Sequence, residues 1–369
     1  MIFNSPQLQK LREKYVDVPL FRAPGIIVLD RREDLVKERA YLEFLITSIP
    51  PIKQKEWLGR LLDTDWKQYL GVWFEMMLYG WLKGFTIVDV EPEIEGHKPD
   101  FAVQLDDKKI ILEAVSCLIS DEEREKESWR DAILWTIDQI RLPYVVSIEH
   151  MKLQKLPDID QIEHQVSAWL KSSPDTKFEF TDKRGNYILC IAEYVENFKT
   201  VGVFGPSKGE WINPDLLKPS LKRKARQHKQ IRQAGYPYVI CIYIEHPSFE
   251  AEEVAQAWFG KETWIVDTHK MEVVDTRIDL SGLHFWHQDV RHRSVSGTLI
   301  FRKQWDPSSQ ARSLDAWYVE NPYAINPLSP DIFPVKAVYQ VVERTPKGYT
   351  MGWKKKQTGN LSGGAPMFP

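Results

Sequence analysis

The segment that runs from Glu75 to Glu113 constrains the fold more than any other part of the chain. Glu75 lies in an apolar stretch whose periodicity is typical of a helix, and Gly84 ends that helix. The residues that follow predict three short strands, at about 85–91, 99–105 and 109–116. We therefore expect a β-sheet with the Glu75 helix beneath it, as in α/β proteins.

Two carboxylates of this segment are expected to converge on one point. Asp100 follows Pro99 at the start of one strand, and Glu113 ends the apolar run Ile110-Ile111-Leu112 in the next. An acid in a strand that is buried on both faces is costly unless a cation accompanies it. Mg²⁺ is usually held by one or two carboxylates together with water and substrate phosphate oxygens. The pattern therefore predicts a site for Mg²⁺ or Mn²⁺.

Neighbouring groups are expected to complete that site. The backbone carbonyl of Ala114 would supply a third oxygen, and Glu75 would bind through water or hold a second ion. Each acid taken singly has a simpler interpretation, a strand-end or helix-surface carboxylate paired with a nearby lysine. The order and spacing of Glu75, Asp100 and Glu113 together favour the metal site.

This arrangement resembles the PD-(D/E)XK nuclease superfamily, which has the restriction-endonuclease-like fold. The resemblance covers about 65–117 and 216–245, and its motif residues are Glu75, Pro99, Asp100, Glu113 and Ala114. It implies an α/β core in which a central mixed β-sheet is flanked by helices. It also implies an endonuclease, a hydrolase that cleaves phosphodiester bonds with Mg²⁺ or Mn²⁺, and we expect DNA as its partner and substrate.

The chain departs from the superfamily at one position, because Val115 stands where a lysine is usual, two residues after the second acid. Several branches take this lysine from the following helix, and the sequence predicts a strongly basic helix over 216–234. Lys224 and Gln227 are three residues apart and can share a face of it. The resemblance implies that these two residues complete the catalytic site, and Lys222 is the second candidate for the lysine. Neighbouring carboxylates would keep Lys224 protonated, which favours electrostatic stabilisation over action as a general base.

The same helix carries more positive charge than one site can use. A solvated basic face is the simplest interpretation, and contact with nucleic-acid phosphates, which needs no base-specific geometry, is the functional one. The residues expected to make such contacts are Lys222, Arg223, Arg226 and Lys229.

Composition limits the binding partners and the cellular location that we expect. The formal net charge of the 369-residue chain is only -3, so any basic binding surface must be local. No apolar run of about 18 residues occurs, so we expect no membrane partner. The start of the chain lacks the pattern of a signal peptide. The three cysteines are widely spaced and indicate buried free thiols in a reducing compartment, so a cytoplasmic location is expected. The oligomeric state stays open.

One elaborated α/β domain is expected. Its parts are a helical extension at 1–64, a core at 65–260 with an insertion at about 118–215, a C-terminal elaboration at 261–356 packed on the core, and a disordered tail at 357–369. Because Val115 replaces the lysine, an alternative stays open: a catalytically inactive module that binds nucleic acid or a protein partner. The two readings differ in whether the Lys224 amine lies within about 4–6 Å of the Asp100 and Glu113 carboxylates.

Overall fold

A computed structural model shows that the chain divides into two compact units. The first comprises Met1–Val16, Pro24–Leu118 and Ile212–Pro369, and the second comprises Asp17–Ala23 and Ile119–Trp211. The structure describes residues 2–18, 22–105, 107–117, 121–172, 177–196, 201–204, 215, 217–227, 231, 235–245, 251–260, 262–267, 272–278, 282–283, 285–286, 289–290, 292–306, 311–329, 331–345 and 348–356. The expected tail at 357–369 lies outside this part.

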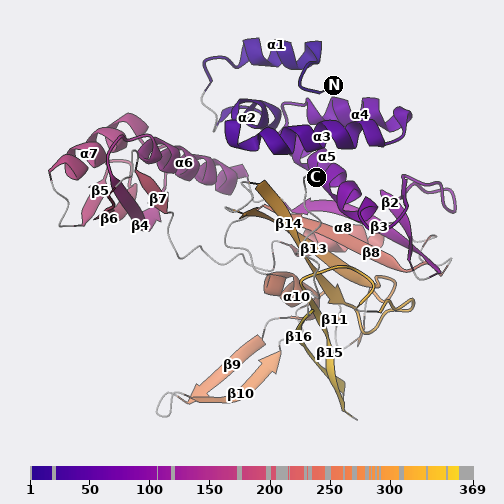
Figure 1. Ribbon diagram of the computed structural model, residues 1–369. Helices are drawn as coiled ribbons and strands as arrows, with labels where there is room; N and C mark the ends of the chain where they lie inside the picture. Colours follow the sequence, from indigo (N-terminus) through magenta and orange to yellow (C-terminus); the bar gives the residue numbers. More distant parts are fainter. Residues whose placement is uncertain are drawn as a thin grey trace. The chain divides into compact units, whose positions relative to one another are not determined.

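An eight-stranded mixed sheet forms the centre of the first unit, in the order β1-β2-β3-β8-β13-β14-β15-β16 (Figure 1). The strands are β1 (Val88–Val90), β2 (Phe101–Leu105), β3 (Lys108–Cys117), β8 (Tyr238–Ile244), β13 (Gly297–Asp306), β14 (Ala311–Glu320), β15 (Ala337–Thr345) and β16 (Gly348–Lys355). The pairs β3–β8, β8–β13 and β14–β15 are parallel, and the other neighbours are antiparallel. The expected α/β class with a mixed sheet is therefore confirmed.

The middle of the sheet is the most deeply buried part of the unit. All seven residues of β8 are buried, and its sequence YVICIYI is apolar and rich in β-branched side chains. A strand covered by helices on both faces shows this continuous apolar pattern instead of alternation. β8 therefore forms a rigid base beside β3, the strand that carries Glu113.

The N-terminal helices cover one face of the sheet. They are α1 (Pro6–Lys14), α2 (Gly25–Arg31), the short 3₁₀ helix η2 (Glu33–Leu35), α3 (Val36–Ser48), α4 (Pro51–Leu61) and α5 (Trp66–Lys83). α5 begins at Asp65, whose carboxylate accepts a hydrogen bond from the Lys67 N–H, and it ends at Gly84 as expected. Its Phe74 ring packs against the rings of Tyr243 and Phe301, with centroids 5.5 and 5.6 Å apart. This contact places Glu75 above the central strands.

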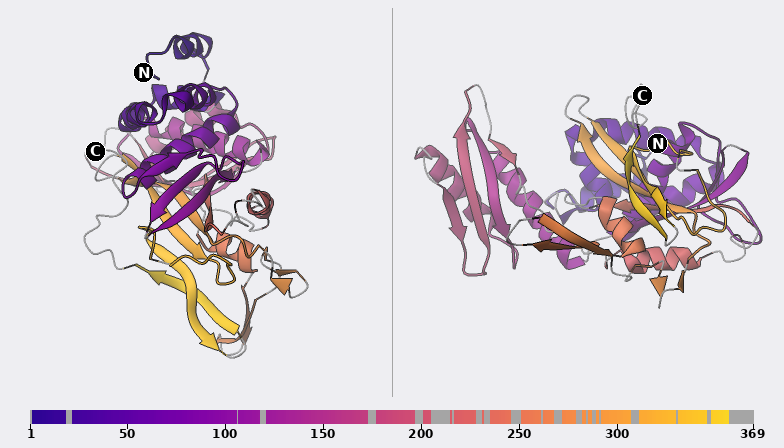
Figure 2. Two further views of the ribbon diagram at one scale, coloured as in Figure 1. Left: turned by 90° about the vertical axis from the view of Figure 1, so that its right-hand side faces the viewer. Right: turned by 90° about the horizontal axis from the view of Figure 1, so that it is seen from below.

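Two further helices cover the opposite face, α8 (Lys218–Arg226) and α10 (Ala251–Phe259). Figure 2 shows them on the side of the strands away from the N-terminal helices. Leu221 and Ala225 of α8 belong to one buried apolar cluster with Val115 of β3 and Ile240 of β8. Side chains alternate along a strand, so Glu113 and Val115 lie on the same face of β3. The packing of α8 on Val115 therefore also fixes the position of α8 relative to Glu113.

β3 runs from Lys108 to Cys117, close to the strand expected at about 109–116, and Glu113 lies within it. One local expectation differs from the structure. The basic helix expected over 216–234 ends at Arg226, and Gln227 follows it in an extended conformation (φ −66°, ψ 157°). Gln227 therefore caps the helix and does not share a helical face with Lys224.

The C-terminal strands β13–β16 continue the central sheet from β8, whereas the sequence suggested a region packed on the core. Two small hairpins precede them, formed by β9 (Glu262–Asp267) with β10 (Glu272–Ile278) and by β11 (Phe285–Trp286) with β12 (Asp289–Val290).

The second unit corresponds closely to the expected insertion at 118–215 and has a core of its own. Its sheet has the order β5-β6-β4-β7 and is accompanied by two helices. The elements are α6 (Asp121–Asp138), β4 (Tyr144–Lys152), α7 (Ile159–Lys171), β5 (Phe178–Thr181), β6 (Tyr187–Tyr194) and β7 (Gly202–Phe204). Ile162, Val166 and Leu170 of α7 form a buried stripe at helical spacing. All candidate site residues belong to the first unit.

Candidate functional site

Strand pairing brings the two predicted acids together. Phe101 of β2 pairs with Leu112 of β3, so Asp100, directly before Phe101, lies beside Glu113, directly after Leu112. The Ala114 N–H donates to Asp100 Oδ2 at 2.7 Å, which anchors the carboxylate. The Glu113 side chain is 2% exposed and that of Asp100 is 28% exposed. The site therefore has one buried acid and one that solvent or a ligand can reach.

Lys224 of α8 joins these acids from a distant part of the sequence. Its Nζ lies 2.6 Å from Glu113 Oε2 and 3.3 Å from Asp100 Oδ2. The Lys224 carbonyl accepts a hydrogen bond from Tyr238 Oη at 2.9 Å, which ties the helix to β8. Both amine–carboxylate distances lie inside the range that we expected for a lysine supplied by the helix. Asp100, Glu113 and Lys224 form a cluster that we call the acid–lysine site.

Electrostatics in the acid–lysine site follow from burial and close charges. Burial raises the pKa of Asp100 to about 7, the Glu113 carboxylate adds to this effect, and Lys224 opposes it. Burial alone would lower the pKa of Lys224, but the two carboxylates outweigh it and the pKa is raised. Lys224 therefore carries its charge at neutral pH, as expected, while Asp100 is held close to its protonation midpoint.

The donor set of this site fits a hard divalent cation. Asp100 Oδ2 and Glu113 Oε2 both face the Lys224 ammonium group, so two carboxylate oxygens already converge on one positive charge. No group of three or more His, Cys, Asp or Glu side chains suited to a metal gathers in the described part of the chain. Water and substrate oxygens would have to complete the coordination, which is usual for Mg²⁺. The predicted role of the Ala114 carbonyl stays a prediction.

The Glu75 carboxylate forms an ion pair with a residue that the sequence did not indicate. Arg60 of α4 donates from Nη1 to Glu75 Oε2 and from Nη2 to Glu75 Oε1, both at 2.8 Å. Gly71 leaves room for the guanidinium, because a Cβ there would lie 3.2 Å from Arg60 Nη2. The Glu75 charge still contributes to the raised pKa of Asp100. With both oxygens bound to Arg60, Glu75 acts on the site through its charge, and direct metal ligation would require this pair to open.

Gln227 stands at the end of α8 with its side-chain Oε1 buried and without a hydrogen-bond partner among the described residues. Its N–H donates to the Lys224 carbonyl at 3.1 Å. Gln227 is thus coupled to the backbone of Lys224, and the described contacts do not include a bond from its side chain to Asp100 or Glu113.

Val115 occupies the position at which the resemblance would place a lysine, and its side chain is part of the apolar core. Val115 is 5% exposed and lies in the apolar cluster with Leu221 and Ala225. A lysine stem at this position would enter the contact between β3 and α8. The same contact instead carries Lys224 above the acids, one turn along α8 from Leu221.

The predicted phosphate contacts on α8 face solvent. Lys222, Arg223 and Arg226 are exposed, and Lys229 lies outside the described residues. Exposure suits both interpretations of this face, a solvated surface and a nucleic-acid contact.

No protein-family model matches the chain, and comparisons with curated proteins and with solved structures found no match either. Within the described residues, none of the helices has the length and apolar character needed to cross a membrane. Cys117, Cys190 and Cys241 are buried free thiols, as expected.

Proposed function

We propose that the chain is a Mg²⁺- or Mn²⁺-dependent nuclease of the restriction-endonuclease-like type that hydrolyses phosphodiester bonds in DNA. The single observation that carries the proposal is the Lys224 amine at 2.6 and 3.3 Å from the two carboxylates. Two acids and one lysine are the charged groups that the resemblance requires, and here the lysine comes from a helix far along the chain.

Each residue of the acid–lysine site has a distinct role in this proposal. Asp100 and Glu113 hold the cation, which when bound supplies Lewis acidity and an activated water. Lys224, a compact charge on a long stem, stabilises the negative charge that develops on the phosphate. Its raised pKa supports this role over proton abstraction. The Arg60–Glu75 pair keeps a second negative charge close to Asp100.

DNA as the substrate follows from the resemblance and from local charge. Because the net charge is only -3, attraction to a polyanion must come from particular surfaces. The exposed residues Lys222, Arg223 and Arg226 supply one such surface on the helix that carries Lys224. A cytoplasmic location is part of the same proposal, because buried free thiols persist in a reducing compartment.

The proposal is tested by incubating the purified protein with plasmid and single-stranded DNA in Mg²⁺, Mn²⁺ or EDTA. We expect cleavage with either metal, none in EDTA, and none from Asp100→Ala in any condition. Lys10→Ala, which removes an exposed charge from α1, is the matched control and should cut like wild type. Cleavage that persists in EDTA or in Asp100→Ala would refute the proposed chemistry.

One observation favours a second function, a binding module without catalysis. Lys224 already pairs with Oε2 of the buried Glu113, so part of the negative charge of the cluster is balanced without any metal. Calorimetry with Mn²⁺ separates the two functions. The nuclease proposal expects micromolar-to-millimolar binding by wild type and none by Asp100→Ala. The binding module expects no Mn²⁺ binding by either protein.

A further inference from the structure

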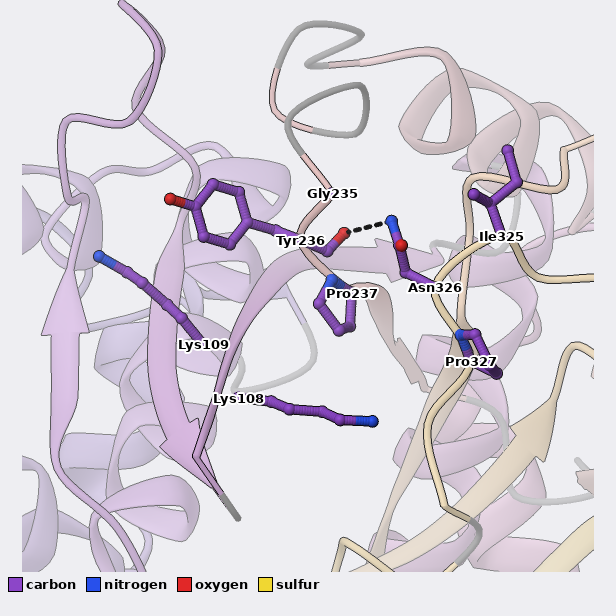
Figure 3. A pocket seen from close by; sticks show the side chains of 8 residues that line it. All are labelled: Lys108, Lys109, Gly235, Tyr236, Pro237, Ile325, Asn326 and Pro327. Atoms are coloured by element: carbon purple, nitrogen blue, oxygen red, sulfur yellow. Dashed lines mark hydrogen bonds between the residues drawn. The ribbon is translucent and has the colours of Figure 1, made fainter.

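A pocket of about 330 Å³ opens at the start of β3, away from the acid–lysine site. Figure 3 shows its lining, which comes from three separate parts of the chain. Lys108 and Lys109 begin β3, Tyr236 precedes β8, and Ile325 and Asn326 belong to the segment that follows β14. Neither the metal nor the cleavage step proposed above uses any of these residues.

Hydrogen bonds fix the walls of this pocket. Asn326 Nδ2 donates to the Tyr236 carbonyl at 3.4 Å, the bond drawn in Figure 3. The Asn326 carbonyl accepts from Ser296 Oγ at 2.6 Å, and the same Oγ accepts from the Tyr238 N–H at 3.0 Å. The entry to β8 and the segment after β14 are therefore held together, and the pocket does not depend on one loose loop.

The lining offers two kinds of contact to a ligand. The described residues that line the pocket include two lysines and no carboxylate. In Figure 3 the Lys109 amine and the Tyr236 ring lie on the same side of β3, whereas Lys108 extends toward Pro327. Ile325 adds an apolar surface that is 62% exposed. Sites that bind single-stranded nucleic acid typically combine two features. Lysines attract the phosphates, and a nearby aromatic ring stacks on a base.

The backbone relates this pocket to the acid–lysine site. Lys109 and Glu113 point to the same face of β3, because side chains alternate along a strand, and they lie about 13 Å apart along it. Tyr236 lies two residues before Tyr238, whose hydroxyl contacts the Lys224 carbonyl. The two places are therefore only a few nucleotide steps apart, although Ile111 between them is buried in the cluster with α8.

We propose that this pocket binds one unpaired nucleotide of the substrate strand, with Lys109 on the phosphate and Tyr236 against the base. A volume of about 330 Å³ suits a single small ligand. The inference rests on the proposed function and narrows it, because the preferred substrate is then DNA with a single-stranded segment or end.

The test measures binding in EDTA, where no cleavage interferes. The probes are a short fluorescein-labelled single-stranded oligodeoxynucleotide and the blunt duplex of the same sequence, followed by anisotropy over a salt series. Wild type is expected to prefer the single strand. Lys109→Ala should weaken binding and reduce the slope of log affinity against log salt by about 0.7, the value for one lost phosphate contact.

Tyr236→Leu separates stacking from charge. Loss of the ring should weaken single-strand binding by about tenfold or more while the salt slope and duplex binding stay unchanged. Leucine keeps apolar contact with the core on which Tyr236 packs, and a thermal melt checks folding. Should this variant unfold, Lys109→Ala still decides the matter. Lys10→Ala, the matched control, should match wild type in both measurements.

If both Lys109→Ala and Tyr236→Leu keep the wild-type affinity and salt slope, the proposed binding of a nucleotide in this pocket is refuted. Equal losses for single strand and duplex in both variants would also overturn it, because they indicate a general basic surface. The nuclease proposal fails separately. Wild type that binds the single strand through this pocket but leaves DNA intact in Mg²⁺ and Mn²⁺ would support the pocket and refute the nuclease.

Discussion

At the scale of single residues, the proposed function of this chain depends on where one lysine comes from. Val115 occupies the usual position and belongs to the core, while Lys224 reaches the acids from α8. The sequence predicted that Asp100, Glu113 and Lys224 would meet, the two acids from their places in neighbouring strands and Lys224 from the family resemblance. It could not predict Arg60, because the Arg60–Glu75 pair depends on how α4 packs on α5. It was also wrong about the helical placement of Gln227, since nothing local marks the end of α8 at Arg226.

Asp100 makes stability depend on pH in the metal-free protein. Its pKa in the folded chain, about 7, lies above the ordinary value of 3.8, so folding favours the protonated form. The stabilisation from this proton is present at low pH and is lost as pH rises through about 7. Asp100→Asn should therefore be more stable than wild type by about 1–3 kcal/mol at pH 8.

Thermal melts in EDTA between pH 5 and 8.5 test this linkage, at about half-unit steps. The difference in melting temperature between Asp100→Asn and wild type should be several degrees at the alkaline end and should shrink toward the acid end. An Asn variant that melts below wild type at pH 8 would contradict the raised pKa of Asp100.

At the scale of elements, β2, β3 and α8 bring the acid–lysine site together, and Glu75 of α5 acts on it through its charge. The bounds of α5 agree with the sequence because Asp65 and Gly84 are local start and stop signals. The bounds of α8 do not, and its placement depends on Leu221 and Ala225 against the sheet. Local patterns thus predict which elements exist, while long-range packing decides which of their side chains meet.

The Arg60–Glu75 pair is expected to lock α4 to α5. Arg60→Ala would leave the Glu75 carboxylate, which is 16% exposed, without its bidentate partner, so we expect a loss of about 1–3 kcal/mol in the free energy of unfolding. The double variant Arg60→Met with Glu75→Leu should recover most of that stability, because neither charge is then left unpaired. Urea denaturation measures all three proteins, and an Arg60→Ala variant as stable as wild type would show that the pair contributes nothing.

At the scale of the whole molecule, each unit has a sheet and an apolar core of its own. The sequence placed an insertion at about 118–215 because the resemblance does not cover that stretch, but it did not indicate a separate unit or the inclusion of Asp17–Ala23 in it. It did not reveal that β13–β16 extend the central sheet, because pairing between strands far apart in sequence leaves no local pattern.

Separate cores predict separate unfolding transitions. Ile162→Ala removes a fully buried side chain from the second unit and should cost about 2–5 kcal/mol. Calorimetry should then show one transition lowered, with the other transition and Mn²⁺ binding unchanged. Ile240→Ala, in the core of the first unit, is the matched control and should lower the other transition. If both variants lower a single common transition, the units do not unfold independently.

The proposed chemistry depends on Lys224, and the measurement that tests it most directly compares DNA cleavage by Lys224→Ala and Lys222→Ala, two variants of one helix. Lys224→Ala should lose about 100-fold or more in kcat while Mn²⁺ binding, measured by calorimetry, survives. Lys222→Ala should cut at the wild-type rate with saturating DNA and show a smaller salt dependence of binding. Wild-type cleavage by Lys224→Ala would contradict the central claim.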